Sequence, residues 1–97
     1  MMVLVSYDVS TLDKAGRNRL RKVAKKCEDF GMRVQNSVFE CCIDPAQWVQ
    51  LKNALTGIYN EEEDSLRFYF MGKNWERRIE HHGIKHIPNV EKDTIII

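Results

Sequence analysis

Apolar, β-branched runs typical of strands alternate with two segments whose apolar residues recur at helical spacing, in the order β-α-β-β-α-β. That order predicts an α+β fold of the ferredoxin-like type. The chain has 97 residues, 43% of them hydrophobic, which suits one domain with one core. A last apolar run predicts an extra C-terminal strand. We therefore expect a ferredoxin-like domain over residues 1–72 and a C-terminal extension over residues 73–97.

The first predicted strand, at residues 2–9, is a nearly continuous apolar run that places Asp8 at or near its C-terminal end. A carboxylate is costly to bury unless it is paired, hydrogen-bonded or bound to a metal. Binding and catalytic residues are also often found where a strand passes into a loop. Asp8 is therefore the first candidate site residue. The alternative is that it only caps the turn after the strand.

A helix is predicted between the capping residues Ser10 to Asp13 and a C-terminal Gly31. Its outer surface is strongly basic, with no acid between residues 14 and 26, and the basic residues are Lys14, Arg17, Arg19, Arg21, Lys22, Lys25 and Lys26. Such a face on a chain of net charge +1 favours a polyanionic partner. The alternative is a merely solvated helix face. Arg17 and Arg19 flank the apolar stripe, where their heads can reach past the helix edge.

Residues 32–43 read as two short strands with a break near residues 35–37. Asp44 and Pro45 then form a helix start, with a capping residue followed by proline at the first helical position. The second helix presents an apolar face made of Trp48, Leu51, Leu55 and Ile58.

The last strand of the domain, at residues 65–71, alternates cleanly. Leu66, Phe68 and Phe70 are expected to face the helices, and the intervening residues the other way. With both helices on one face, the second face of the sheet lacks cover within one copy of the chain. We expect a homodimer packed sheet to sheet, with the two Asp8 side chains facing each other near the two-fold axis.

The final residues, Thr94 to Ile97, are too apolar to remain in water. They are expected to pair with the sheet edge of the other protomer or to dock on a partner protein. The alternative is that they fold back on their own sheet.

A single carboxylate cannot complete a magnesium site, because Mg²⁺ takes six oxygen ligands, usually one or two carboxylates with water and phosphate. Two Asp8 side chains facing each other across a dimer axis, with water and a scissile phosphate, could form such a site for Mg²⁺ or Mn²⁺. His81, His82 and His86 lack a partner ligand at zinc-like spacing.

Four motifs in order resemble the CRISPR-associated protein two family, the smaller of the two nearly universal CRISPR adaptation proteins. They are Val5-Ser6-Tyr7-Asp8-Val9, Arg17-Asn18-Arg19, the string from Gly31 to Phe39, and Asp64-Ser65-Leu66-Arg67-Phe68-Tyr69. The resemblance spans residues 1 to about 71 and is weak beyond Gly72. It implies a ferredoxin-like homodimer, a metal-dependent endonuclease acting on RNA or duplex DNA, and a scaffold role beside the larger adaptation integrase.

The resemblance also implies roles for individual residues. Asp8 corresponds to the family's metal-binding carboxylate. Five further residues match positions associated with nucleic-acid contact or site architecture, namely Tyr7, Arg17, Arg19, Arg33 and Phe39. The charge pattern adds Lys14 and Arg21 to the arginines expected to hold phosphate backbones.

The leading interpretation is a CRISPR adaptation protein with a metal-dependent nuclease site. One alternative is a catalytically silent dimeric adaptor that holds nucleic acid for the integrase. A second is a generic ferredoxin-like domain that binds a metabolite. No apolar stretch approaches the roughly 18 residues of a membrane span, and no export signal opens the chain. We therefore expect a cytoplasmic protein without a membrane partner.

Overall fold

The computed structural model describes residues 1–84 and has the predicted order of elements. These are β1 (Met2–Asp8), α1 (Lys14–Phe30), β2 (Met32–Gln35), β3 (Val38–Cys42), α2 (Pro45–Ile58), β4 (Ser65–Phe70) and a short 3₁₀ helix, η1 (Trp75–Arg78). The predicted strand at residues 94–97, and with it the exchange of that strand between protomers, lies outside the described residues.

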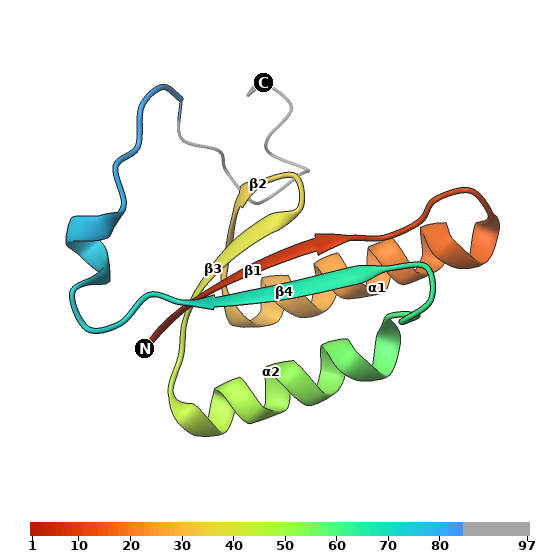
Figure 1. Ribbon diagram of the computed structural model, residues 1–97, viewed down its shortest axis with the longest axis horizontal. Coiled ribbons are helices and arrows are strands. Elements are labelled where there is room, and N and C mark those ends of the chain that lie inside the picture. Colours follow the sequence, from red (N-terminus) through yellow and green to blue (C-terminus); the bar gives the residue numbers. More distant parts are fainter. Residues whose placement is uncertain (85–97) are drawn as a thin grey trace.

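The four strands form one antiparallel sheet in the order β2-β3-β1-β4. Both helices cover the same face of this sheet (Figure 1). The order and the one-sided helices are those of the ferredoxin-like arrangement, so the predicted fold class is confirmed. The break expected near residues 35–37 is a turn at residues 36–37, between the end of β2 and the start of β3.

Residues that the sequence marks as caps set both ends of α1 and the start of α2. The Asp13 carboxylate accepts a hydrogen bond from the Gly16 amide at 2.8 Å, and the Gly31 amide donates to the Cys27 carbonyl at 2.9 Å. Asp44 and Gln47 form a capping box at the start of α2. The Asp13 cap starts α1 directly after the loop of residues 9–13 that follows β1.

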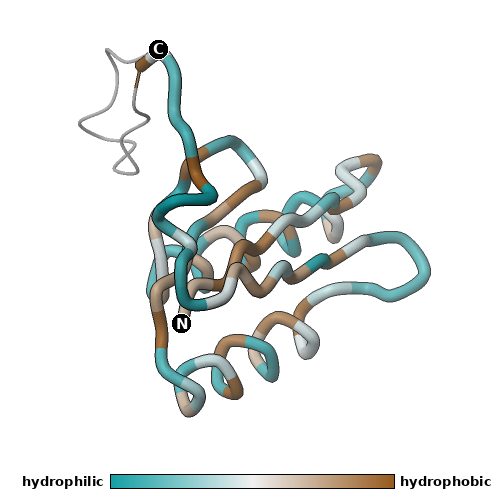
Figure 2. Tube along the Cα trace, turned by 60° about the vertical axis from the view of Figure 1, so that its left-hand side comes forward, coloured by the Kyte–Doolittle hydropathy of each residue, from teal (hydrophilic) through white to brown (hydrophobic). Residues whose placement is uncertain are grey.

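The core lies between the sheet and the helices. Alternate residues of β1, such as Val3 and Val5, are fully buried against α1 and α2. Trp48 of α2 contacts the rings of Phe68 and Phe70 edge-on, with centroids 4.9 and 5.1 Å apart. Hydrophobic and hydrophilic residues alternate along both helices, as expected of helices with one buried face (Figure 2). Within residues 1–84, no helix is long and apolar enough to cross a bilayer.

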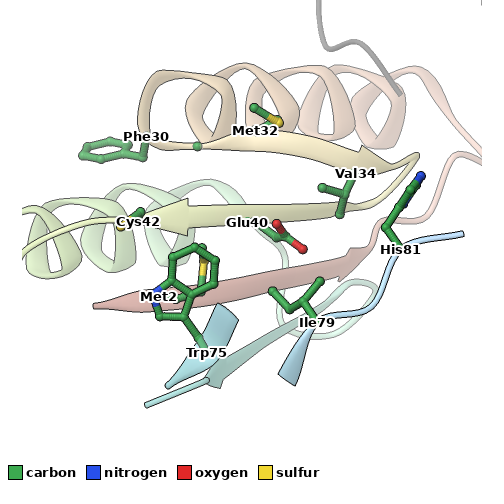
Figure 3. A pocket seen from close by; sticks show the side chains of 10 residues that line it. Met2, Phe30, Met32, Val34, Glu40, Cys42, Trp75, Ile79 and His81 are labelled. Carbon is green, nitrogen blue, oxygen red and sulfur yellow. The ribbon is translucent and has the colours of Figure 1, made fainter. Parts of the chain in front are cut away.

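The other face of the sheet, which we call the open face, is partly covered by the chain that follows β4. Trp75, Ile79 and His81 lie across from side chains of β1, β2 and β3, and a cavity of about 830 Å³ separates the two layers (Figure 3). The expectation that one copy leaves this whole face uncovered is therefore wrong for the part over Met2. Sequence patterns did not signal this cover because residues 76–84 are mostly polar and lack strand or helix periodicity.

Gly16 allows the loop after β1 to lie directly against α1. A Cβ at this position would overlap the carbonyl oxygen of Ser10, whereas a Cβ at Gly57 of α2 would contact nothing within 4 Å. Gly16→Ala is therefore expected to cost about 1–3 kcal/mol of unfolding free energy, and Gly57→Ala to gain about 0.5–1 kcal/mol. Urea unfolding of both variants tests this, and equal shifts of the same sign would contradict it.

Candidate functional site

Asp8 is the last residue of β1 and its side chain is exposed on the open face. Successive strand residues point to opposite faces, so Tyr7 turns toward the helices while Asp8 turns away from them. In the ladder, Asp8 pairs with Ser65, the first residue of β4. The carboxylate therefore stands at the end of the central strand β1, beside the start of the edge strand β4, accessible to a ligand or to a second copy of the chain.

A cationic cleft lies at the same end of the sheet, on the helix side. It has a volume of about 630 Å³ and runs between α1 and the β2–β3 turn. Its charged lining consists of four cations and one acid, namely Arg17, Arg21, Lys25, Arg33 and Glu28. An open cleft with this excess of positive charge is suited to a phosphate-bearing ligand.

Arg33 is held in the cleft by an aromatic ring. Its guanidinium carbon lies 5.1 Å from the centroid of Phe39, and Phe39 in turn stacks on Tyr7 with centroids 6.2 Å apart. A terminal nitrogen of Arg33 reaches Glu28 at 4.0 Å, but its Nε is buried and has no hydrogen-bond partner within the described part of the chain. An unpaired buried donor is costly. The side chain as a whole is 18% exposed, so an acceptor from outside would reach Arg33 through its terminal nitrogens.

Tyr7 forms the floor of the cleft and is only 4% exposed. Burial raises the pKa of its hydroxyl, so the group stays protonated at neutral pH. That hydroxyl donates a long hydrogen bond of 3.4 Å to the Asn36 carbonyl in the β2–β3 turn. Tyr7 thus links β1 to the turn beside Arg33, and its single O–H can donate to an incoming oxygen in place of this long bond.

Arg19 is engaged inside the protein instead of facing a ligand. Its Nε donates to Asp64 at 2.8 Å, and its side chain is 16% exposed while that of Asp64 is fully buried. The Arg19 guanidinium lowers the pKa of the Asp64 carboxyl to about 2, and backbone amides of Asn60 and Ser10 act in the same direction. Sequence analysis placed Arg19 on the flank of the apolar stripe but could not identify a partner 45 residues away.

The pKa of Asp64 predicts acid-dependent stability. Because the folded-state pKa lies below the ordinary value, this carboxylate stabilises the fold fully near neutral pH, and the contribution is lost as pH falls from about 4 through 2. Asp64→Asn is therefore expected to be destabilising at pH 7, with a difference from the wild type that shrinks toward pH 2. Urea unfolding at several pH values measures this, and a difference that is constant with pH would contradict it.

The predicted site residues fall into four places. Tyr7, Arg17, Arg21 and Arg33 line the cleft, and Phe39 supports it from the core. Asp8 lies at the same end of the sheet but on the open face, and Arg19 is paired with Asp64. Lys14 is exposed at the start of α1 and does not line the cleft.

Two residues of the site were missed by sequence reasoning. No sequence pattern marked Glu28 as a site residue, beyond its position on the predicted helix. Asp64 is the last residue of an acidic run directly before a strand, and it also opens the fourth family motif. These two features were the available hints that it has a role beyond that of a surface charge.

One chain alone offers little to a metal ion. Within residues 1–84, no group of three or more histidine, cysteine, aspartate or glutamate side chains is close enough to hold one. Asp8 nevertheless has the hard oxygen donor that Mg²⁺ and Mn²⁺ prefer, and it is exposed to water and to other ligands. The residues present therefore fit such an ion only if further ligands come from a second copy of the chain, from water or from a bound phosphate.

Comparison with known proteins gives consistent relatives. The family model described as "CRISPR associated protein Cas2" matches residues 1–79. A protein of Chlorobaculum tepidum named "CRISPR-associated endoribonuclease Cas2" is 53% identical over 96 residues, which cover 99% of this chain and 100% of that protein. A Halalkalibacterium halodurans protein named "CRISPR-associated endonuclease Cas2" is 48% identical over 97 residues, covering 100% of this chain and 99% of the other. The crystal structure of Streptococcus pyogenes Cas2 superposes with a TM-score of 0.76 at 61% identity, covering 86% of this chain and 100% of that one.

Proposed function

The chain belongs to the Cas2 family of CRISPR-associated proteins, and from this premise we propose that it is a metal-dependent endonuclease of CRISPR adaptation. It would hydrolyse phosphodiester bonds of single-stranded RNA or duplex DNA, and would work beside the larger adaptation integrase. The observation on which the proposal depends most is Asp8, an exposed carboxylate at the end of a central strand, at the same end of the sheet as a cationic cleft.

A second copy of the chain would supply the ligands that one copy lacks. Asp8 shares the open face with Leu4, Tyr69 and Met32, and the last two are each 42% exposed. Large apolar side chains on a sheet face favour burial against another surface. Two copies packed through this face would bring their Asp8 carboxylates toward a common axis, giving a site with two carboxylates.

The dimer is tested by Leu4→Glu. Leu4 lies in the middle of the open face, beside Glu40 on β3 and Tyr69 on β4. A carboxylate there adds like charge next to Glu40 and again across the dimer axis, so self-association is expected to weaken at least about tenfold. Sedimentation equilibrium measures the dissociation constant, and circular dichroism controls for the fold. An unchanged dissociation constant would place the interface elsewhere.

The chain's own residues would bind and position the nucleic acid. Arg17, Arg21 and Arg33 would each donate charge-assisted hydrogen bonds to non-bridging phosphate oxygens, without reading bases. The protonated Tyr7 hydroxyl, at the floor of the same cleft, would donate to a phosphate or sugar oxygen. These contacts would fix a strand at the end of the sheet where Asp8 stands.

At Asp8, the carboxylate oxygens of the two copies would hold a divalent ion together with the scissile phosphate. Mg²⁺ or Mn²⁺, when bound, lowers the pKa of a water ligand and offsets the charge that develops on the phosphate. The carboxylates would also accept a hydrogen bond from the attacking water and so orient it.

The scarcity of acidic ligands favours one alternative function. One carboxylate per copy supplies few ligands for the metal ion of a nuclease. Within residues 1–84, no group of three or more possible metal ligands lies near it. The alternative is a non-cleaving dimeric adaptor that uses the same cationic cleft to hold nucleic acid for the integrase.

Cleavage assays separate the two functions. The purified full chain is incubated with end-labelled single-stranded RNA and duplex DNA, with Mg²⁺, Mn²⁺ or EDTA. The nuclease proposal expects product with Mg²⁺ or Mn²⁺ and none with EDTA. Binding of either substrate without any metal-dependent cleavage would overturn it and leave the adaptor function.

A further inference from the structure

The carboxylate of Asp64 is fully buried and connects three segments of the chain. Its Oδ1 accepts hydrogen bonds from the Ser10 amide at 3.0 Å and an Arg19 terminal nitrogen at 3.3 Å. Its Oδ2 accepts from Arg19 Nε at 2.8 Å and from the Asn60 amide at 2.9 Å. One side chain therefore satisfies donors from the loop after β1, from α1 and from the loop before β4.

These bonds begin where the sheet ladder ends. Asp8 pairs with Ser65 as the last register pair between β1 and β4. Two residues beyond Asp8, the Ser10 amide is bound by the residue that immediately precedes Ser65. The Asp64 side chain thus continues the attachment of β1 to β4 past the last pair of the ladder. Terminal residues of a strand fray unless something ties them down.

The carbonyl group of Ser10 packs closely against the first turn of α1. Its oxygen lies so close to α1 that only a glycine fits at position 16, since a Cβ there would overlap it. Asp13 caps α1 at the same turn by accepting from the Gly16 amide. Ser10 is therefore bound at its amide by Asp64, and its carbonyl oxygen lies against the start of α1. Surface loops are usually more mobile than the elements they connect, so these contacts restrict a segment that would otherwise be free to move.

We propose that Asp64, clamped by Arg19, is a positioning residue for Asp8. It does not contact the nucleic acid. By fixing the chain immediately after Asp8, it holds the end of β1 in one conformation and aims the Asp8 carboxylate at the open face. Groups that orient a ligand in this way typically change metal affinity or activity by about 10- to 100-fold when they are removed. The inference rests on the proposed nuclease function for its catalytic consequence, but its structural part can be measured separately.

The test uses Asp64→Asn and the milder Arg19→Lys in the full chain. Arg19→Lys keeps the charge but loses the planar guanidinium that donates two bonds to Asp64. Two controls accompany them. Asp29→Asn removes a carboxylate from an exposed ion pair with Lys26 on α1, whose contribution is small. Val23→Ala lowers stability through the core without touching the loop.

We measure amide hydrogen exchange at Ser10 and the NMR order parameter of Asp8 without metal, then Mn²⁺-dependent cleavage of labelled substrate. In Asp64→Asn, exchange at Ser10 should accelerate at least about tenfold and the order at Asp8 should fall. The kcat should drop, or the Mn²⁺ concentration for half-maximal rate should rise, on the order of 10-fold. KM for nucleic acid should stay within about twofold because the cleft is untouched. Arg19→Lys should change each quantity in the same direction by less.

The outcomes separate this inference from the proposed function. If the wild type cleaves nothing, the nuclease proposal fails. The rate of amide exchange at Ser10 and the order parameter of Asp8 then still decide whether Asp64 positions Asp8. If Asp64→Asn leaves Ser10 and Asp8 unchanged, the inference is overturned even where the wild type is active. If Val23→Ala reproduces both the kcat and the metal effects, the role of Asp64 is general stability and the inference is again overturned. If Asp64→Asn does not fold, Arg19→Lys decides by the same criteria.

Discussion

An Asp8→Asn variant is expected to lose at least about 100-fold in metal-dependent cleavage, a loss of about 3 kcal/mol in transition-state stabilisation. The amide keeps the shape of the carboxylate but removes the charge that a divalent ion requires. Affinity for nucleic acid measured in EDTA should stay within about twofold, because Asp8 and the cationic cleft lie on opposite faces of the sheet. Single-turnover rates and EDTA binding curves measure the two quantities.

Mixed dimers test whether the two copies share one metal site. If two Asp8 side chains share one site, a dimer of one wild-type copy and one Asp8→Asn copy should be nearly as inactive as the dimer of two variant copies. If each copy has its own site, the mixed dimer should retain about half of the wild-type rate. Glu40→Gln is the matched control, since Glu40 is another carboxylate on the same face, opposite Leu4 on β1. If Glu40→Gln lowered the cleavage rate as much as Asp8→Asn does, Asp8 would have no special role among the carboxylates of this face.

The fold could be predicted because its signals are local. Asp13 and Gly31 mark the ends of α1, and Asp44 with Pro45 marks the start of α2. Strand alternation at residues 65–71 indicated the correct buried face, because each of these signals depends on residues only one to four positions apart. The polar segment after β4 lacks such a signal, and its position over the open face depends on contacts distant in sequence.

The candidate site could be predicted only in part, for the same reason. Helical spacing placed Arg17 and Arg19 on the two flanks of α1 and made them look equivalent. In the structure, Arg17 is exposed at the cleft, whereas Arg19 is held by the buried Asp64. A buried ion pair between residues this far apart leaves no periodic pattern. The stacking of Arg33 on Phe39 likewise depends on the register of β2 against β3, which pairs the two residues directly.

The three cleft arginines are expected to dominate nucleic-acid binding. Arg17→Gln, Arg21→Gln and Arg33→Gln should each weaken binding about tenfold, since a hydrogen bond to a charged group contributes roughly 1.5–3 kcal/mol. Each should also reduce the slope of log affinity against log salt concentration by about 0.9 for duplex DNA or about 0.7 for single strands, because each removes one phosphate contact. Substrates of unrelated sequence should bind alike, since phosphate contacts carry no base information. Fluorescence anisotropy titrations between low and moderate salt measure both quantities.

Two controls make the arginine prediction specific to the cleft. Lys26→Gln removes a cation of α1 that pairs with Asp29 outside the cleft, and it should change neither affinity nor slope appreciably. Arg19→Gln should lower the unfolding free energy, because it leaves the buried Asp64 carboxylate without its charged partner, while the salt slope of the folded protein stays unchanged. A slope that falls equally for Arg19 and Arg33 variants would mean that the total positive charge of the chain, and not the geometry of the cleft, holds the nucleic acid.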